Sequence, residues 1–296
     1  MSASNLWRIC DNGGRDAAPM GRGWTVGVTY DRQRAADFFD EYGEQEWTRF
    51  EQVRMGPANF GVHAHYLRRF VNAGDRVLDV GAGPGRFTIE LARLGAEIVV
   101  ADVSPGQLAL NREKVAEAGL EGSVLERVPA DVTDLSAFAD ASFDAAVCYG
   151  GPLSYVVDRA DDAVAELVRV VRPAGHVLVS EMSLVGAFAH YADVVLELAA
   201  RDGTEKLEEI VRSGFLPEEP DYGHLPLRLF RWRELRELLA RHGEVVAAAA
   251  AGLLRPTEQP ATPELLDFLV RVELDLGSEP AAVDAAEHLL AVLRKP

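Results

Sequence analysis

DVGAGPGRFT, residues 79–88, is the stretch that decides how this chain folds. The apolar residues just before it predict a buried strand, and residues 89–94 after it predict a helix. A glycine-rich turn between a strand and a helix lets a ligand approach the backbone, because glycine accepts unusual dihedral angles and has no Cβ. The stretch therefore predicts a ligand-binding turn, and a tight turn without a ligand is the simpler alternative.

The spacing of the glycines narrows the choice of ligand. They fall at positions 81, 83 and 85, whereas Arg86 occupies the position of the third glycine in a dinucleotide-binding turn. Asp79 stands two residues before the first glycine, where a carboxylate suits an ammonium or sulfonium group and repels a pyrophosphate. This pattern resembles motif I of the class I S-adenosylmethionine-dependent methyltransferases.

The resemblance implies a particular set of contacts at the turn. Asp79 helps to hold the amino group of the cofactor, and the turn packs against the methionine part. The turn residues assigned in this way are Gly81, Ala82, Gly83 and Gly85. The cofactor implied is S-adenosyl-L-methionine, which leaves as S-adenosyl-L-homocysteine after transfer of its methyl group.

Strands and helices alternate from Arg76 onward, which predicts a doubly wound α/β fold. Apolar runs predict strands at 77–80, 97–102, 124–128, 143–149, 176–180, 244–250 and 287–293. Helical patterns are found at 63–71, 88–94, 105–118, 161–171, 185–200, 205–211, 231–241 and 263–276. The resemblance implies a Rossmann-like sheet of seven strands, mostly parallel with an antiparallel last strand, together with helical cap elements.

Three regions are expected along the chain. Residues 1–28 lack hydrophobic periodicity and predict a flexible N-terminal tail. Residues 29–72 predict a helical cap, and residues 73–296 predict the S-adenosylmethionine-binding domain. An insertion at 184–228 interrupts the alternation of strands and helices and is expected to form a second cap element. In members of the family that act on small molecules, elements at these two places close the site.

Two further acids follow predicted strands at the sheet edge where open α/β folds bind ligands. Asp102 can accept both ribose hydroxyls of the cofactor as a bidentate pair. The resemblance assigns Asp131 to the exocyclic amine of adenine and the Val132 backbone to its ring. Val103 and Tyr149 complete the predicted set of cofactor-binding residues. Taken singly, an acid after a strand is more often a turn residue than a ligand.

The acceptor end of the site depends on weaker signals. Methyl transfer is an in-line displacement, so positioning supplies most of the catalysis and a base is needed only for an acceptor that must lose a proton early. The catalytic candidates are His190, Glu181 and Tyr155, which follow predicted strands at the sheet edge near the acceptor. Phe39 and Trp47 either cover the site as part of a lid or fasten the cap helices to the core.

Composition argues against several kinds of partner. The formal net charge is −17 over 296 residues, which disfavours a nucleic-acid substrate. Cys10 and Cys148 lie far apart and make no metal-binding spacing, so no metal is expected. No apolar stretch approaches the ~20 residues of a membrane span, and a cytoplasmic location is the default expectation. The sequence leaves open whether the protein forms a homodimer.

These observations together predict methyl transfer from S-adenosylmethionine to an O, N or C nucleophile of a small molecule. A chain poor in lysine and rich in alanine and arginine indicates a GC-rich bacterial genome, which fits an acceptor from specialised metabolism. Two alternatives remain open. One is a non-catalytic S-adenosylmethionine-binding or partner-activating subunit, and the other is a nicotinamide-dependent oxidoreductase.

Overall fold

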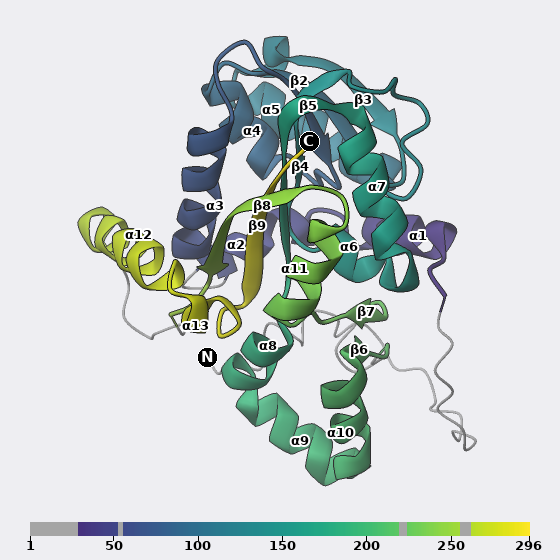
Figure 1. Cartoon of the computed structure of the whole chain (residues 1–296), viewed down its shortest axis with the longest axis vertical. Coiled ribbons are helices and arrows are strands. Elements are labelled where there is room, and N and C mark those ends of the chain that lie inside the picture. Colours follow the sequence, from purple (N-terminus) through teal and green to yellow (C-terminus); the bar gives the residue numbers. More distant parts are fainter. Residues whose placement is uncertain (1–28, 53–55, 219–223, 255–261) are drawn as a thin grey trace.

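A computed structural model describes residues 29–52, 56–218, 224–254 and 262–296 (Figure 1). The side chains of residues 49–52 lie outside this description. The flexible tail predicted for residues 1–28 also lies outside the described residues. Within the described ranges, every helix is too short or too polar to span a membrane.

A seven-stranded sheet of order β3-β2-β1-β4-β5-β9-β8 forms the centre of the described structure. Its strands are β1 (Arg76–Val80), β2 (Glu97–Asp102), β3 (Val124–Pro129), β4 (Phe143–Cys148), β5 (Val171–Met182), β8 (Glu244–Ala251) and β9 (His288–Arg294). β9 runs antiparallel to both β5 and β8, and the remaining neighbours pair in parallel. The predicted fold class is confirmed.

Helices cover both faces of the sheet (Figure 1). Those before the insertion are α1 (Arg32–Tyr42), α2 (Gln45–Gln52), α3 (Gly56–Phe70), α4 (Arg86–Arg93), α5 (Pro105–Glu117), α6 (Pro152–Tyr155) and α7 (Ala160–Val170). Those that follow are α8 (Leu184–His190), α9 (Ala192–Asp202), α10 (Thr204–Ser213), α11 (Trp232–Ala240), α12 (Pro263–Gly277) and α13 (Pro280–Val283), with a small hairpin of β6 (Phe215–Leu216) and β7 (Leu227–Arg228) between α10 and α11.

The core lies on the two faces of the sheet. Strand residues such as Val77 and Leu78 are fully buried, as expected for parallel strands covered on both sides. One face packs against α3, α4 and α5 through residues such as Leu67 and Leu91. The other face packs against α6, α7 and α11 through residues such as Leu167. This packing holds the carboxyl ends of β1, β2 and β4 in place as the base of a site.

Several predicted boundaries differ from the structure, two of them for clear local reasons. β5 begins at Val171, five residues before its predicted start, and residues 172–175 form a bulge inside the strand. Gly175 permits this bulge, because a Cβ there would lie 2.5 Å from the Asp144 carbonyl oxygen. The single helix expected at 185–200 is divided into α8 and α9, since the backbone of Tyr191 leaves the helical region at φ −114° and ψ 38°.

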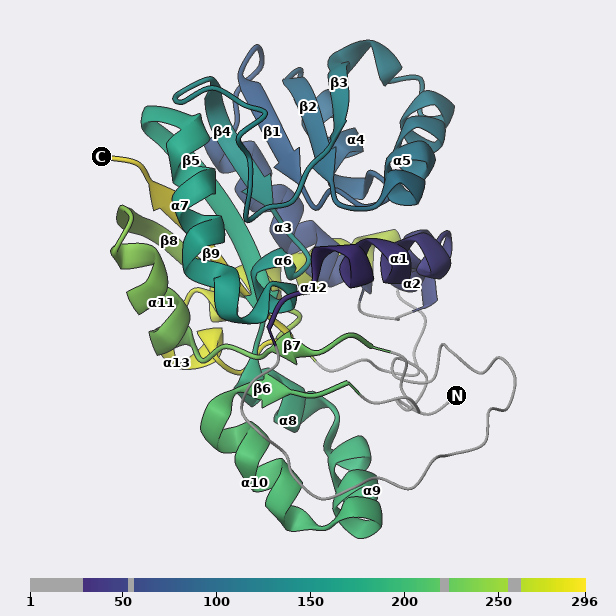
Figure 2. The ribbon, with the colours of Figure 1, turned by 90° about the vertical axis from the view of Figure 1, so that its right-hand side faces the viewer.

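The two predicted cap regions are built differently (Figure 2). α3 begins at Gly56, seven residues earlier than predicted, and its residues Val62 and Leu67 belong to the sheet core. α1 and α2 lie across the end of the sheet, whereas α8, α9 and α10 form an arm that projects away from it. This arm has its own apolar cluster, which includes Leu184, Leu198 and Ile210.

Candidate cofactor and active site

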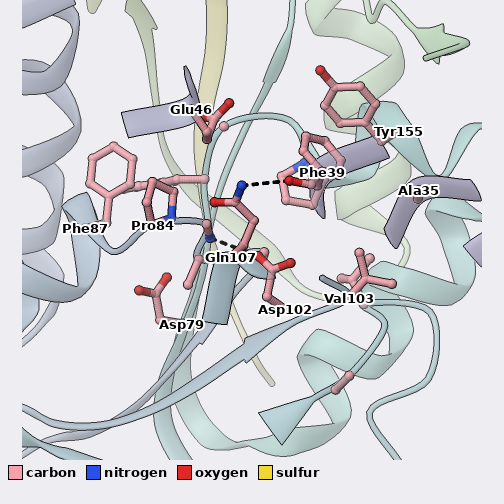
Figure 3. A pocket seen from close by; sticks show the side chains of 18 of the residues that line it. Ala35, Phe39, Glu46, Asp79, Pro84, Phe87, Asp102, Val103, Gln107 and Tyr155 are labelled. Atoms are coloured by element: carbon pink, nitrogen blue, oxygen red, sulfur yellow. Dashed lines mark hydrogen bonds between the residues drawn. The ribbon is translucent and has the colours of Figure 1, made fainter. Parts of the chain in front are cut away.

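A pocket of about 1050 Å³, counting the part open to solvent, lies at the carboxyl ends of β1, β2 and β4 (Figure 3). Most of its wall comes from the segments that follow β1, β2, β3 and β4, including residues of α4, α5 and α6, and the rest comes from the N-terminal part of the chain up to α2. The lining residues are Tyr30, Ala35, Phe39, Glu46, Asp79, Gly81, Ala82, Gly83, Pro84, Arg86, Phe87, Asp102, Val103, Gln107, Ala130, Val132, Tyr149, Gly150, Pro152, Tyr155 and Val156.

The glycine turn leaves bare backbone facing this pocket. Gly83 has a φ of 52°, and a Cβ added there would meet nothing closer than Glu46 Cγ at 3.7 Å and Gln107 Oε1 at 3.9 Å. Gly81 is enclosed instead, because a Cβ there would lie 2.8 Å from Pro152 Cγ. Gly85 does not line the pocket. It lets α4 and α5 approach, since its Cβ would lie 2.9 Å from Asn111 Nδ2.

Asp79, at the end of β1, is buried and forms part of the pocket wall. The Thr88 hydroxyl donates a hydrogen bond to its carboxylate at 2.6 Å, and the Asn111 amide donates to the same hydroxyl at 2.9 Å. Burial raises the pKa of Asp79 to about 7, with the nearby Asp102 charge adding to the effect and the Thr88 hydrogen bond opposing it. A cation in the pocket would favour the ionised form.

Asp102, at the end of β2, accepts two backbone hydrogen bonds. Gly83 N–H donates to Oδ2 at 2.8 Å and Ser104 N–H donates to Oδ1 at 2.9 Å. Burial raises the pKa of Asp102 to about 6, although both hydrogen bonds favour its ionised form. The charges of Glu46 and Asp40 also raise this pKa, so the cap places negative charge close to Asp102.

The predicted adenine-binding acid, Asp131, accepts hydrogen bonds from other residues of the chain through both of its carboxylate oxygens. The Tyr30 hydroxyl donates to Asp131 Oδ2 at 2.8 Å, and the Thr133 backbone and hydroxyl both donate to Oδ1 at 2.8 Å. Asp131 is outside the pocket lining, whereas its neighbours Ala130 and Val132 are part of it. Burial and the Asp131 charge raise the pKa of Tyr30, which stays protonated as a donor.

The three catalytic candidates lie in different places. Tyr155 lines the pocket, and its ring meets that of Phe39 edge-on at 5.3 Å. Glu181 is fully buried outside the lining, where one carboxylate oxygen accepts from Ser154 N–H at 2.8 Å and burial raises its pKa to about 8. His190 Nε2 lies 3.1 Å from the Ala285 carbonyl oxygen, also outside the lining. The structure therefore brings only Tyr155 of the three candidates to the pocket.

Several lining residues were not predicted, and Tyr30 and Gln107 are two polar examples. Tyr30 comes from the segment before α1, 101 positions from its partner Asp131, and nothing in the local sequence indicates that contact. Gln107 belongs to the pattern Ser-Pro-Gly-Gln, in which the Ser104 hydroxyl caps α5 by accepting from Gln107 N–H at 2.9 Å. That pattern is the start of a capping box, and it could have placed Gln107 in the first turn of a helix beside Asp102.

The aromatic residues of the cap differ in role. Phe39 lines the pocket, whereas Trp47 lies under the Arg86 guanidinium, whose carbon is 4.2 Å from the ring centroid. Arg86 also donates to the Trp47 carbonyl oxygen. Tyr149, which follows β4, packs between the rings of His63 and Phe87 at centroid distances of 4.8 and 5.1 Å. Within the described residues, no cluster of His, Cys, Asp and Glu could hold a metal ion.

Residues 77–175 match the family profile described as a methyltransferase domain, and this range contains the glycine turn and the strands that carry the acids. Residues 77–175 therefore form a methyltransferase domain, and over this range the chain is similar to the class I S-adenosylmethionine-dependent methyltransferases. The predicted family is thereby confirmed.

Two curated relatives are similar to part of this chain. The demethylmenaquinone methyltransferase of Clavibacter sepedonicus is 40% identical over 111 residues, which are 38% of this chain and 42% of that protein. The methyltransferase GfsG of Streptomyces halstedii is 36% identical over 135 residues, 45% of this chain and 46% of that protein. The match spans less than half the length of either relative.

Solved structures share the fold at low identity. The [4+2]-cyclase SpnF aligns with a TM-score of 0.56 and 19% identity, over 92% of this chain and 98% of that one. At this identity the likeness shows the fold alone.

Proposed function

We propose that this protein transfers a methyl group from S-adenosyl-L-methionine to an O, N or C nucleophile of a small molecule. The observation that carries the proposal is the convergence of the glycine turn, Asp79 and Asp102 on one pocket beneath the cap helices. Bare backbone and two carboxylates suit a ligand that carries a sulfonium, an ammonium group and ribose hydroxyls.

The residues of the pocket fit such a cofactor. Gly83 leaves room for close approach to the backbone, and Asp102 offers carboxylate oxygens beside it. Ala130 and Val132 add apolar surface to the same pocket, which suits a flat adenine ring. When bound, S-adenosylmethionine supplies a methyl group on a positively charged sulfur, which keeps the bonding electron pair and leaves as a neutral thioether.

The acceptor end is supported by the aromatic part of the wall. Phe39, Phe87, Tyr149 and Tyr155 all line the pocket. Aromatic side chains exclude water and pack well against flat or apolar molecules, which favours a small acceptor held for in-line attack. Of the three catalytic candidates, we propose that Tyr155 contacts the acceptor. An acceptor from bacterial specialised metabolism and a cytoplasmic location belong to the same proposal.

The test separates binding from transfer. S-adenosylhomocysteine should raise the melting temperature, and NAD should not, because a ligand at one hundred times its Kd stabilises the protein by about 2.7 kcal/mol. Equal shifts with both ligands would contradict the proposal. Incubation with S-adenosylmethionine labelled in its methyl group and a bacterial metabolite extract should then give a labelled small molecule. Binding without any labelled product would support the alternative of a non-catalytic subunit.

A further inference from the structure

Gln107 contacts the cap with one end of its amide and the pocket with the other. Its side chain is 1% exposed, and Nε2 donates to the carbonyl oxygens of Phe39 at 2.9 Å and Gly43 at 3.0 Å. These two acceptors fix the orientation of the amide, because the nitrogen must face them. The oxygen Oε1 therefore faces the pocket, where it has no hydrogen-bond partner among the described residues.

A buried oxygen without a donor indicates that a partner belongs there. Buried polar atoms are nearly always hydrogen-bonded in native proteins, and each exception calls for an explanation. Oε1 lies 3.9 Å from the position that a Cβ on Gly83 would take, on the side of the turn that faces the pocket. The missing donor is therefore a group that approaches the glycine turn from inside the pocket.

Glu46 lies over the same point of the turn from the cap side. Its Cγ is 3.7 Å from the same position on Gly83, and its charge raises the pKa of Asp102. Figure 3 shows Gln107 between Glu46 above and the carboxylates of Asp79 and Asp102 below. The glycine turn is thus surrounded by the negative charge of Glu46, the Gln107 amide oxygen and the carboxylates of the two strands. This arrangement favours a cationic ligand with N–H and O–H donors.

The cap is fastened close to this point. Asp40 of α1 accepts hydrogen bonds from the Ser104 hydroxyl and from Gly106 N–H, the latter at 2.8 Å. Glu44 pairs with Lys114 of α5 at 3.0 Å. The cap therefore contacts α5, the helix that carries Gln107, both at its first turn and at its last turn.

We propose that Glu46 and Gln107 are cofactor-binding residues that couple docking of the cap to binding of S-adenosylmethionine. The Gln107 oxygen accepts a hydrogen bond from an amino or hydroxyl group of the cofactor while its amide nitrogen holds the end of α1. Glu46 adds a carboxylate that only the docked cap supplies. A ligand that fixes the Gln107 amide thereby favours the docked cap, and a docked cap tightens the ligand. This inference rests on the proposed function, because it names further residues of that site.

Calorimetric titration of the full chain with S-adenosylmethionine and S-adenosylhomocysteine tests the role of Glu46. Glu46→Gln should weaken binding of S-adenosylmethionine by about 10- to 100-fold, the effect of losing a hydrogen bond to a charged group. Binding of S-adenosylhomocysteine should weaken less, because it lacks the sulfonium charge. Glu41→Gln makes the same change of charge on an exposed side chain of α1, and it should change both affinities by no more than about twofold.

Limited proteolysis of residues 29–52 tests the coupling. S-adenosylhomocysteine should protect this segment in the wild-type protein, whereas Gln107→Met should lose that protection and bind both ligands about 3- to 10-fold more weakly. Gln45→Met changes an exposed glutamine of the same cap and should retain the protection. If Gln107→Met fails to fold, the half-buried Glu46 still provides the test. Glu46→Gln should then reduce the protection of residues 29–52 by the ligand.

The outcomes separate this inference from the proposed function. Wild-type protein that binds neither ligand would contradict the proposed function itself. Wild-type protein that binds both, with Glu46→Gln and Gln107→Met binding as tightly as their controls, would overturn the inference and leave the function standing. Weakened binding together with unchanged protection of the cap would also overturn it, because the coupling would be absent.

Discussion

The two helical additions to the sheet, α1–α2 and the arm at 184–228, contribute very differently to the site. α1 and α2 supply three lining residues of the pocket, Ala35, Phe39 and Glu46, whereas the described part of the arm supplies none. The arm buries an apolar cluster of its own, but α1 buries only Ala35 and Ala36. An addition with its own core can stand apart from the sheet, and one without a core must rest on the edge where ligands bind.

The same difference predicts which segment moves. Segments with few buried apolar contacts open at low cost in free energy, and lids over binding sites are drawn from them. The described contacts of α1 and α2 include polar ones to α5 and α4, such as those of Asp40 and Trp47. We therefore expect the cap to admit and release ligands, and we expect the arm to tolerate destabilisation without loss of binding.

The largest expected effect is on the arm. Leu198 is 7% exposed in the apolar cluster of the arm, so Leu198→Ala should lower the free energy of unfolding of the arm by about 2–5 kcal/mol. Urea denaturation would measure the loss, and calorimetry should find S-adenosylhomocysteine affinity changed by no more than about twofold. Leu196→Ala on the same helix is the control, because Leu196 is 70% exposed and its loss should cost under about 0.5 kcal/mol. A large fall in affinity for Leu198→Ala would contradict the expectation that the arm does not contribute to cofactor binding.

The second largest effect is expected on cofactor binding in the pocket beneath the cap. Asp102→Ala removes a carboxylate beside the glycine turn and should weaken cofactor binding by about 1.5–3 kcal/mol, or roughly 10- to 150-fold. Calorimetric titration with S-adenosylhomocysteine would measure it. Asp193→Ala, on an exposed residue in the first turn of α9, should leave the affinity unchanged. Unchanged affinity in Asp102→Ala would show that this residue is a turn residue only.

The sheet and the base of the site could be predicted because both depend on local sequence. β2 matches its predicted bounds and β1 begins one residue early, since continuous apolar runs indicate buried parallel strands wherever they occur. The glycine turn and the acids Asp79 and Asp102 follow from the rule that such strands place their carboxyl ends at one edge. These positions needed no knowledge of distant contacts.

The contributions of the cap and of the arm depend on distant contacts and could not be predicted. The contact of Tyr30 with Asp131 spans 101 positions and has no local signal. The direction of α8 depends on Gly186, whose missing Cβ lets the Ala286 carbonyl oxygen approach to a point 1.7 Å from where that Cβ would be. This approach turns His190 toward Ala285 and away from the pocket.

The third effect is a dependence of cofactor affinity on pH. Burial raises the pKa of Asp79 to about 7 and that of Asp102 to about 6, so both carboxyls take up protons as the pH falls below neutral. A cationic ligand binds the ionised forms, so affinity for S-adenosylmethionine should fall between about pH 8 and about pH 5.5, by up to about tenfold per pH unit for each proton released. Calorimetric titration in two buffers that differ in their enthalpy of ionisation would give the number of protons released when the cofactor binds.

S-adenosylhomocysteine is the control ligand for the pH effect. S-adenosylhomocysteine lacks the sulfonium charge, so its affinity should depend less on pH over the same range. An affinity for S-adenosylmethionine that is constant with pH would contradict the assignment of buried, partly protonated carboxyls to the cofactor wall.

The smallest effect is expected at His190, on the side of the arm. A general base in contact with the acceptor would contribute about 10²- to 10⁴-fold to the rate. His190 lies outside the pocket lining, with Nε2 3.1 Å from the Ala285 carbonyl oxygen, so His190→Gln keeps a donor toward that oxygen and should change kcat by less than about threefold. Methyl-transfer kinetics on the acceptor found with labelled cofactor would measure it. A fall of kcat by a hundredfold or more with an unchanged KM for the cofactor would place His190 at the reacting atoms. The arm would then swing over the pocket during turnover, and the comparison between arm and cap would describe the resting state alone.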